Sequence, residues 1–109
     1  MELKKKKCLP CEGGVPPLKE PEIKELKKQV HNDWKVQDNH KIYREFRFVN
    51  FMHTMEFVNK VAEIAEHEGH HPDMHVSYGK LTIELWTHAI DGLSENDFIL
   101  AAKIDDLKL

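Results

Sequence analysis

Residues 80–85 alternate strictly between apolar and polar side chains, and this period of two constrains the fold more than any other feature of the chain. The apolar positions Leu81, Ile83 and Leu85 fall on one face of the expected strand, whereas Lys, Thr and Glu occupy the other. A strand of this kind has one face in the core and one in water, which is typical of antiparallel sheets. We therefore expect a sheet that is covered on one face only.

The rest of the chain divides into further strand and helix patterns. Strand-like composition or alternation predicts four strands, at 34–37, 41–49, 74–78 and 80–87. Apolar residues at three-to-four spacing predict three helices, at 20–30, 50–67 and 94–107. The order αββαββα favours an α+β fold, a four-stranded antiparallel sheet with three helices on one face.

Four residues are placed to begin or end these helices. Asn50 can cap the second helix, and Gly69 can end it in a left-handed conformation. Ser94 and Asp97 have the spacing of a capping box at the start of the third helix. The spacing alone therefore predicts a structural role for Asp97, as a capping residue of the third helix.

Length and composition indicate the domain organisation. The chain has 109 residues, which is enough for one domain, because two halves would each be too small to bury a core. Residues 1–17 contain two Cys, two adjacent Gly and three Pro, a composition that favours turns and extended chain. We expect an N-terminal arm at 1–17 and a single domain at 18–109.

Charge and hydropathy exclude several classes of function. The formal net charge is −3 and the pI is about 6.2, so no basic surface for a phosphate backbone is expected, and the basic run at 4–7 is interpreted as a solvated tail. No apolar run approaches the roughly 18 residues of a bilayer-spanning helix, and the first residues lead into no apolar signal region. We expect a cytoplasmic protein that binds neither nucleic acid nor a membrane.

Cys8 and Cys11 are the only cysteines, and they do not make the disulfide framework of a small secreted protein. Their spacing leaves open half of a zinc site or a redox pair. The chain has no second CxxC and no βαβ pattern around this one, so we favour two ordinary thiols in the arm.

Histidines crowd the junction between the second helix and the following strand. Of the eight in the chain, His67, His70 and His71 lie directly before Pro72. An imidazole, with an ordinary pKa of about 6.5, can donate or accept a proton near neutral pH, so adjacent imidazoles offer both halves of acid–base chemistry. An imidazolium also stabilises the C-terminal end of a helix, and we favour that interpretation for His67. For His70 and His71, catalysis and a simple surface pair both remain open.

The same stretch contains His67-Glu68-x-x-His71, which matches the H-E-x-x-H motif of zinc proteases. That chemistry requires both imidazoles on one helical face, whereas Gly69 lies inside the motif and Pro72 follows it. A metalloprotease also needs a third ligand and a substrate cleft. A metal-dependent hydrolase is therefore the weakest interpretation, and we expect no metal site.

A longer pattern joins these histidines to residues further along the chain. It consists of Glu66-x-x-x-His70-His71-Pro72, Tyr78 after five residues, His88 after nine more and Asp97 after eight more. This pattern resembles the signature of the pterin-4a-carbinolamine dehydratase family, with every spacing kept. The helix and hairpin that precede it agree with that family too.

The resemblance implies an enzyme that dehydrates a 4a-hydroxytetrahydropterin to quinonoid dihydropterin and water, in the recycling of a tetrahydrobiopterin-type cofactor. It implies catalytic roles for His70, His71 and His88, and no metal or organic cofactor. Elimination brings a proton to the leaving hydroxyl while another leaves a ring nitrogen, so two imidazoles on opposite sides of the substrate are chemically sufficient. We expect His70 and His88 to transfer protons and His71 to orient the substrate.

The remaining positions of the pattern are expected to bind or support the substrate, and each has a structural alternative. Pro72 fixes the exit from the helix, and Asp97 caps the next one. Glu66 either orients an imidazole or lies in solvent, and Tyr78 belongs either to the core or to a pocket wall. Extending the alternation of Leu81, Ile83 and Leu85 places His88 on the uncovered face of the sheet, although the strand need not reach that far.

Family members form homo-oligomers, and a second copy could cover the open edges of the sheet, so we expect a homodimer or a homotetramer. Two other functions stay open beside the dehydratase. One is a non-catalytic binding or dimerisation module on the same fold, and the other is the metal-dependent hydrolase. The sequence does not identify the cellular pterin.

Overall fold

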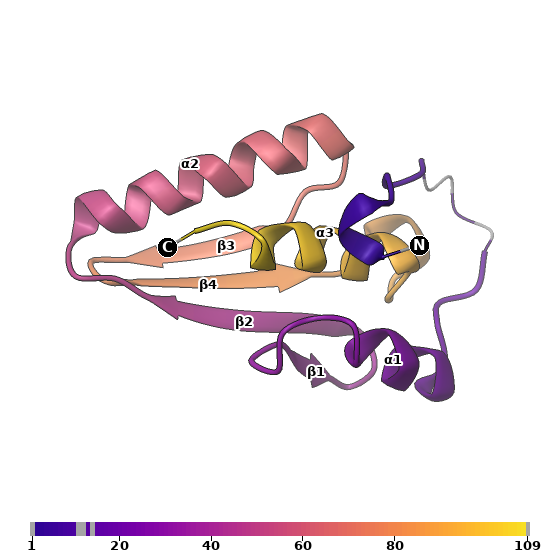
Figure 1. Cartoon of the computed structure of the whole chain (residues 1–109). Coiled ribbons are helices and arrows are strands. Elements are labelled where there is room, and N and C mark those ends of the chain that lie inside the picture. The colour runs from indigo at the N-terminus through magenta and orange to yellow at the C-terminus, as the bar shows by residue number, and fades with distance from the viewer. Residues whose placement is uncertain (1, 11–12, 14, 109) are drawn as a thin grey trace.

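The computed structural model describes residues 2–10, 13 and 15–108 of the chain. Within these residues lie three α-helices, four strands and two short 3-10 helices (Figure 1). In chain order they are η1 (Leu3–Lys5), α1 (Glu20–Lys27), β1 (Lys35–Gln37), β2 (Lys41–Arg47), α2 (Phe51–Glu68), β3 (Asp73–Ser77), β4 (Lys80–Leu85), η2 (His88–Ile90) and α3 (Glu95–Asp105). The predicted order αββαββα is confirmed. In this described part of the chain, none of the helices combines the length and the apolarity that crossing a bilayer requires.

The four strands form one antiparallel sheet in the order β1-β2-β4-β3. Strand β4 is central, and it places Leu85 opposite Ile42 of β2 and Leu81 opposite Val76 of β3. This register follows from the alternation in β4, because a shift by one residue would turn its apolar side chains to water. The short strand β1 and the strand β3 are the two edges.

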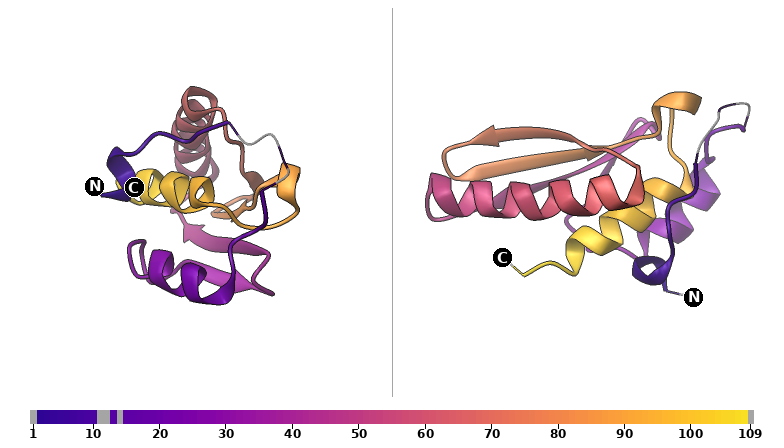
Figure 2. Two further views of the ribbon diagram at one scale, coloured as in Figure 1. Left: turned by 90° about the vertical axis from the view of Figure 1, so that its right-hand side faces the viewer. Right: turned by 90° about the horizontal axis from the view of Figure 1, so that it is seen from above.

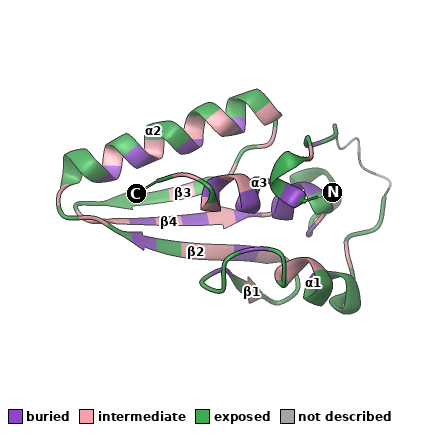
Figure 3. Cartoon of the chain, viewed as in Figure 1, coloured by how far each residue is buried: buried purple, intermediate pink, exposed green. Residues whose placement is uncertain are grey.

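The helices lie on one face of the sheet (Figure 2). The side chains that this face buries include Ile42 and Phe46 from β2 and Leu81, Ile83 and Leu85 from β4. The opposite face carries the polar positions of the same strands and is more exposed (Figure 3). The predicted α+β fold with a sheet covered on one side is therefore confirmed.

Local signals begin and end the elements around the sheet. Asp38 and Asn39, both at φ 53°, make the tight turn between β1 and β2. Asn50 caps α2 by accepting a hydrogen bond from the His53 N–H at 2.8 Å, and Gly69 ends that helix at φ 65°. Strand β4 ends at Leu85, two residues earlier than expected, because the Thr87 N–H donates to the Gly92 carbonyl at 2.8 Å.

The N-terminal segment runs along α3 (Figures 1 and 2). Leu3 and Cys8 are buried, and Lys103 of α3 donates to the Lys4 carbonyl at 2.9 Å. Lys6 pairs with Glu95 at 2.9 Å. Residues 2–10 are thus packed on the helix, and Cys11 lies outside the described residues.

Asp105, near the C-terminal end of α3, connects the helix to the strands. One carboxylate oxygen accepts hydrogen bonds from Trp34 Nε1 at 2.7 Å and from Arg44 Nη1 at 2.6 Å, and the other accepts from the His31 backbone N–H at 2.8 Å. The Arg44 guanidinium also lies 4.3 Å from the centroid of the Phe46 ring. These contacts fix α3 against β2 and the segment before β1.

Candidate active site

Three histidines from two separate parts of the chain line one cavity of about 370 Å³. His70, His71 and Pro72 come from the connection between α2 and β3, and His88 comes from η2. We call this space the histidine cavity. The structure thus brings together the three residues for which catalytic roles are expected.

The end of α2 fixes the position of the His70-His71 pair. Gly69 adopts the left-handed conformation, and the His70 N–H donates to the Ala65 carbonyl at 3.2 Å. These features turn the chain out of the helix immediately before the two imidazoles. Pro72 then leads directly into β3.

His70 is held by the buried carboxylate of Asp97. The His70 Nε2 lies 2.6 Å from Asp97 Oδ1, and the two side chains are 11% and 0% exposed. Asp97 Oδ2 accepts hydrogen bonds from Thr87 Oγ1 at 2.9 Å and from the Ser94 N–H at 3.0 Å. Asp97 therefore caps α3, as predicted, and also binds the imidazole, so the two interpretations are not exclusive.

This arrangement determines what His70 can do chemically. A carboxylate accepts hydrogen bonds only, so Nε2 is the nitrogen that carries the proton towards Asp97. The other ring nitrogen, Nδ1, is then the one that can exchange a proton with a ligand. A buried carboxylate also stabilises the imidazolium that forms when Nδ1 accepts a proton.

His71 lies at the rim of the histidine cavity. Its Nε2 is 2.7 Å from Glu66 Oε1, and the two side chains are 60% and 80% exposed. Glu66 therefore contacts an imidazole, although both groups are well solvated. A pair this exposed orients a side chain but contributes little to stability.

His88 is positioned by stacking. The centroids of the His88 and Trp86 rings are 3.8 Å apart, with their planes inclined by 24°. Trp86 is itself held by two contacts. Its Nε1 donates to Asp73 Oδ2 at 3.1 Å, and the centroid of its ring lies 4.7 Å from that of the His40 ring. Although β4 ends at Leu85, burial keeps alternating beyond it, with Thr87 buried and His88 exposed, so His88 lies beside Trp86 as extending the alternation of the strand predicts.

Tyr78 is not part of the histidine cavity. It lies in the turn between β3 and β4 and is 70% exposed, so it is not a core residue of this chain either. Its backbone carbonyl accepts a hydrogen bond from Thr54 Oγ1 at 2.9 Å. The position serves the hairpin, and a local pattern could not distinguish this role from a pocket wall.

The H-E-x-x-H stretch does not have the geometry of a zinc protease. Helix α2 ends at Glu68, and Gly69 turns the chain, so His67 and His71 do not share a helical face. The His67 side chain is 75% exposed and lies 3.3 Å from Glu68. Among the described residues, no group of three or more His, Cys, Asp or Glu side chains is arranged to hold a metal ion.

Cys8 is buried in contact with α3. Its Sγ lies 3.6 Å from the Asn96 carbonyl, and burial, followed by the negative charge of Glu68, raises the pKa of this thiol to about 12. A thiol that stays protonated is a poor nucleophile and a poor metal ligand. Cys8 therefore packs as a small apolar residue in this structure.

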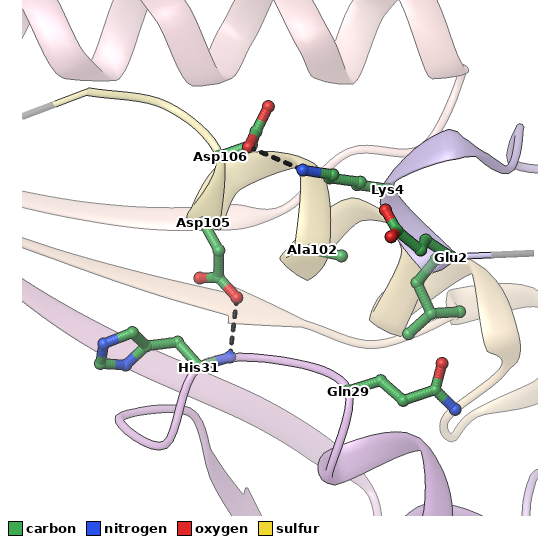
Figure 4. Close-up of a pocket in the computed structure, with 8 residues that line it drawn as sticks. Glu2, Lys4, Gln29, His31, Ala102, Asp105 and Asp106 are labelled. Atoms are coloured by element: carbon green, nitrogen blue, oxygen red, sulfur yellow. Dashed lines mark hydrogen bonds and ion pairs between the residues drawn. The ribbon is translucent and has the colours of Figure 1, made fainter.

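A larger cavity, of about 450 Å³, lies elsewhere, between η1, the segment after α1 and the end of α3 (Figure 4). Three of its charged groups are engaged: Lys4 pairs with Asp106 at 3.3 Å, and Asp105 accepts the hydrogen bond from the His31 N–H. The cavity shares no residue with the histidine cavity. Its contacts connect the N-terminal segment, α3 and the segment between α1 and β1.

Comparison with known proteins gives one consistent family. The family model described as "Pterin 4 alpha carbinolamine dehydratase" matches residues 16–107. Proteins of Rickettsia bellii (strain OSU 85-389) and Nitrosomonas europaea, each named "Putative pterin-4-alpha-carbinolamine dehydratase", are 53% and 54% identical to this chain over 106 residues. Those alignments cover 97% of this chain and 94% and 93% of the two relatives.

Solved structures agree with the sequence relatives. A crystal structure described as a transcriptional coactivator/pterin dehydratase from Brucella melitensis aligns with a TM-score of 0.74 and 30% identity, covering 81% of this chain and 94% of that one. A pterin dehydratase-like protein described as a RuBisCO assembly factor in the alpha-carboxysome aligns with a TM-score of 0.58 and 22% identity, covering 70% and 92%. The second likeness shows a shared fold alone.

Proposed function

This chain belongs to the pterin-4a-carbinolamine dehydratase family, a family of hydro-lyases, and from that premise we propose that it dehydrates a 4a-hydroxytetrahydropterin to quinonoid dihydropterin and water. The observation that carries the proposal is the meeting of His70, His71 and His88 at one cavity, with His70 bound to the buried Asp97. The reaction serves the recycling of a tetrahydrobiopterin-type cofactor.

The reaction needs two proton movements and no change of oxidation state. The bond between C4a and the hydroxyl oxygen breaks, that oxygen leaves as water after accepting a proton, and a ring nitrogen loses a proton to form the quinonoid product. Imidazoles near neutral pH can perform both steps without a metal or an organic cofactor.

His70 and His88 form the proton-transfer pair. His70 exchanges its proton at Nδ1, while the hydrogen bond from Nε2 to Asp97 at 2.6 Å holds the ring and stabilises its charged form. His88, stacked on Trp86, acts from η2. His71 and Glu66 orient the substrate from the rim of the histidine cavity. Pro72 restricts the backbone between the His70-His71 pair and the start of β3.

The chain assembles as a homodimer or a homotetramer through its open edges. Strand β3 is an edge strand with Asp73, His75 and Ser77 exposed, and β1 is a short edge on the other side. Unpaired strand edges are commonly covered by a second copy in soluble proteins. Light scattering on the purified chain measures this assembly directly.

A non-catalytic binding module is the second candidate. It is favoured by the Brucella melitensis structure, whose description names both a coactivator and a pterin dehydratase at 30% identity. A module would need an intact fold but no proton-transfer pair. Turnover therefore separates the two candidates.

The experiment is a dehydration assay on the purified, full-length chain. Synthetic carbinolamine is mixed with the protein, and formation of the quinonoid product is followed by absorbance against the uncatalysed rate. The proposal requires acceleration that survives exhaustive chelation, since no metal takes part. A folded protein without acceleration would support the binding module, and activity abolished by chelation and restored by metal would support a hydrolase-like metal site.

A further inference from the structure

An apolar residue of the N-terminal segment lines the histidine cavity. Leu9 is 71% exposed, yet it is among the residues that form the wall of the cavity with His70, His71 and His88. The sequence pattern of the family includes nothing from this segment. Leu9 therefore needs its own explanation.

The backbone of Leu9 is held by one buried side chain. Asn96, which is 9% exposed, accepts a hydrogen bond from the Leu9 N–H at 3.0 Å through Oδ1 and donates to the Leu9 carbonyl through Nδ2 at 2.6 Å. A side-chain amide that pairs with both backbone groups of one residue fixes its position and its orientation. Leu9 is thus exposed but not free to move away.

Cys8, the residue before Leu9, is also held in place by hydrogen bonds. The Cys8 N–H donates to Glu68 Oε1 at 2.8 Å, and the Cys8 thiol is buried beside the Asn96 carbonyl. The Glu68 side chain is 5% exposed and lies 3.6 Å from Lys103. Two helices therefore hold the segment, α2 through Glu68 and α3 through Asn96.

The groups that hold the segment are the chain neighbours of the groups that form the site. Glu68 precedes the His70-His71 pair by two residues, and Asn96 is directly followed by Asp97, which binds His70. Leu9 and His70 are therefore positioned by the same two helix ends. This makes the distance between Leu9 and the imidazole a fixed property of the fold.

We infer that Leu9 contacts the pterin ring of the substrate and that Asn96 is a positioning residue that holds Leu9 against it. The inference deepens the proposed function and rests on it. A pterin is a flat heteroaromatic ring, and covering one of its faces with an isobutyl group removes apolar surface of both partners from water. Because the backbone of Leu9 is already fixed, little conformational entropy opposes this contact. The contact stabilises bound substrate and transition state alike, so it acts on KM and not on kcat.

The test compares Leu9→Ala with the wild type in the dehydration assay. Losing the isobutyl contact is expected to raise KM about 3- to 10-fold and to leave kcat within about twofold. The matched control is Val49→Ala, at an apolar residue that is 76% exposed and does not line the cavity, and its KM should stay unchanged. Thermal unfolding checks that both variants remain folded.

A double-mutant cycle tests the role of Asn96. Asn96→Ala should raise KM by a similar factor in the wild-type background, but by little in the Leu9→Ala background, because Asn96 acts through Leu9. A merely structural role would instead lower stability and leave the two KM effects additive. Additive effects would overturn the positioning role.

A titration with 7,8-dihydropterin, followed by fluorescence, separates failure of this inference from failure of the proposed function. A wild type that neither turns over nor binds the dihydropterin overturns both. A wild type that binds or turns over, together with a Leu9→Ala variant of unchanged Kd and KM, overturns the inference alone. A parallel rise of Kd and KM in Leu9→Ala, absent in Val49→Ala, supports it.

Discussion

Asp97 binds His70 through one carboxylate oxygen at 2.6 Å and caps α3 through the other, which accepts from the Ser94 N–H at 3.0 Å. One buried side chain thus serves the site and the fold together. The helix start that positions Asp97 also determines where His70 is held. A change at Asp97 should therefore alter activity and stability in the same variant.

Asp97→Asn tests that double role. The amide keeps the size of the side chain but removes the charge that stabilises the His70 imidazolium, so kcat should fall roughly 10- to 100-fold. The weakened cap and hydrogen bonds to Thr87 and Ser94 should lower the free energy of unfolding by about 2 kcal/mol. Steady-state kinetics and urea unfolding measure the two effects, and a stable variant with unchanged kcat would contradict the assignment.

Trp86→Ala should separate stacking from acid–base chemistry at His88. Without the ring that lies 3.8 Å from it, the imidazole samples more orientations, and kcat should fall roughly 10-fold. Trp86→Phe retains an aromatic face and should recover most of that loss. Equal rates in the wild type and the alanine variant would show that the stack does not position His88.

Asp105→Ala should destabilise the fold without a specific effect on catalysis. The change leaves the Arg44 guanidinium, 11% exposed, and the Trp34 indole N–H without the carboxylate that binds both. Breaking such a pair from one side should lower the free energy of unfolding by about 3 kcal/mol. The prediction fails if chemical unfolding gives the wild-type value, or if the folded variant loses its kcat.

The Cys8 thiol should resist alkylation in the folded protein. In a Cys11→Ser variant, which leaves one thiol, a pKa of about 12 means that only about one molecule in a thousand is ionised at pH 9, against half for a thiol at its ordinary value of 9.0. Labelling by iodoacetamide should therefore be slow until denaturant is added. Fast labelling under native conditions would contradict the buried, protonated thiol.

The same pKa predicts how stability depends on alkaline pH. Because the folded-state pKa of Cys8 lies above the unfolded value of 9.0, the unfolded thiol ionises first. Its contribution to stability is intact below pH 9 and is lost as the pH rises towards 12. Between pH 9 and 10.5, a Cys11→Ser protein should lose more unfolding free energy than the Cys8→Ala/Cys11→Ser variant, and equal losses would refute the shift.

Much of the fold could be predicted from local patterns. The alternation in β4 predicts its covered face, and the capping residues Asn50 and Gly69 predict both ends of α2. These signals are readable because a strand face or a helix cap involves residues within a few positions of one another. The same signals misplace the end of β4, because the bridge between Thr87 and Gly92 competes with the strand.

The site could be predicted only in part. The pattern of the family predicts roles for His70, His71 and His88, but neither the stacking of Trp86 on His88 nor the two contacts of Asp97. The hold of Asn96 on Leu9 joins residues 87 positions apart, and no local periodicity encodes such a contact. The exposure of Tyr78 could not be predicted either, because the sequence around an aromatic residue does not show whether it lies in an exposed turn, in the core or in the wall of a pocket.

The most direct test of the account is the kcat for carbinolamine dehydration in His70→Ala and His88→Ala, measured beside His75→Ala. His75 is an exposed histidine of β3 outside the histidine cavity, so its variant controls for loss of an imidazole as such. We predict a fall in kcat of roughly 100-fold or more in each of the first two variants and wild-type kcat in the third. Undiminished turnover in both His70→Ala and His88→Ala would contradict the proton-transfer pair.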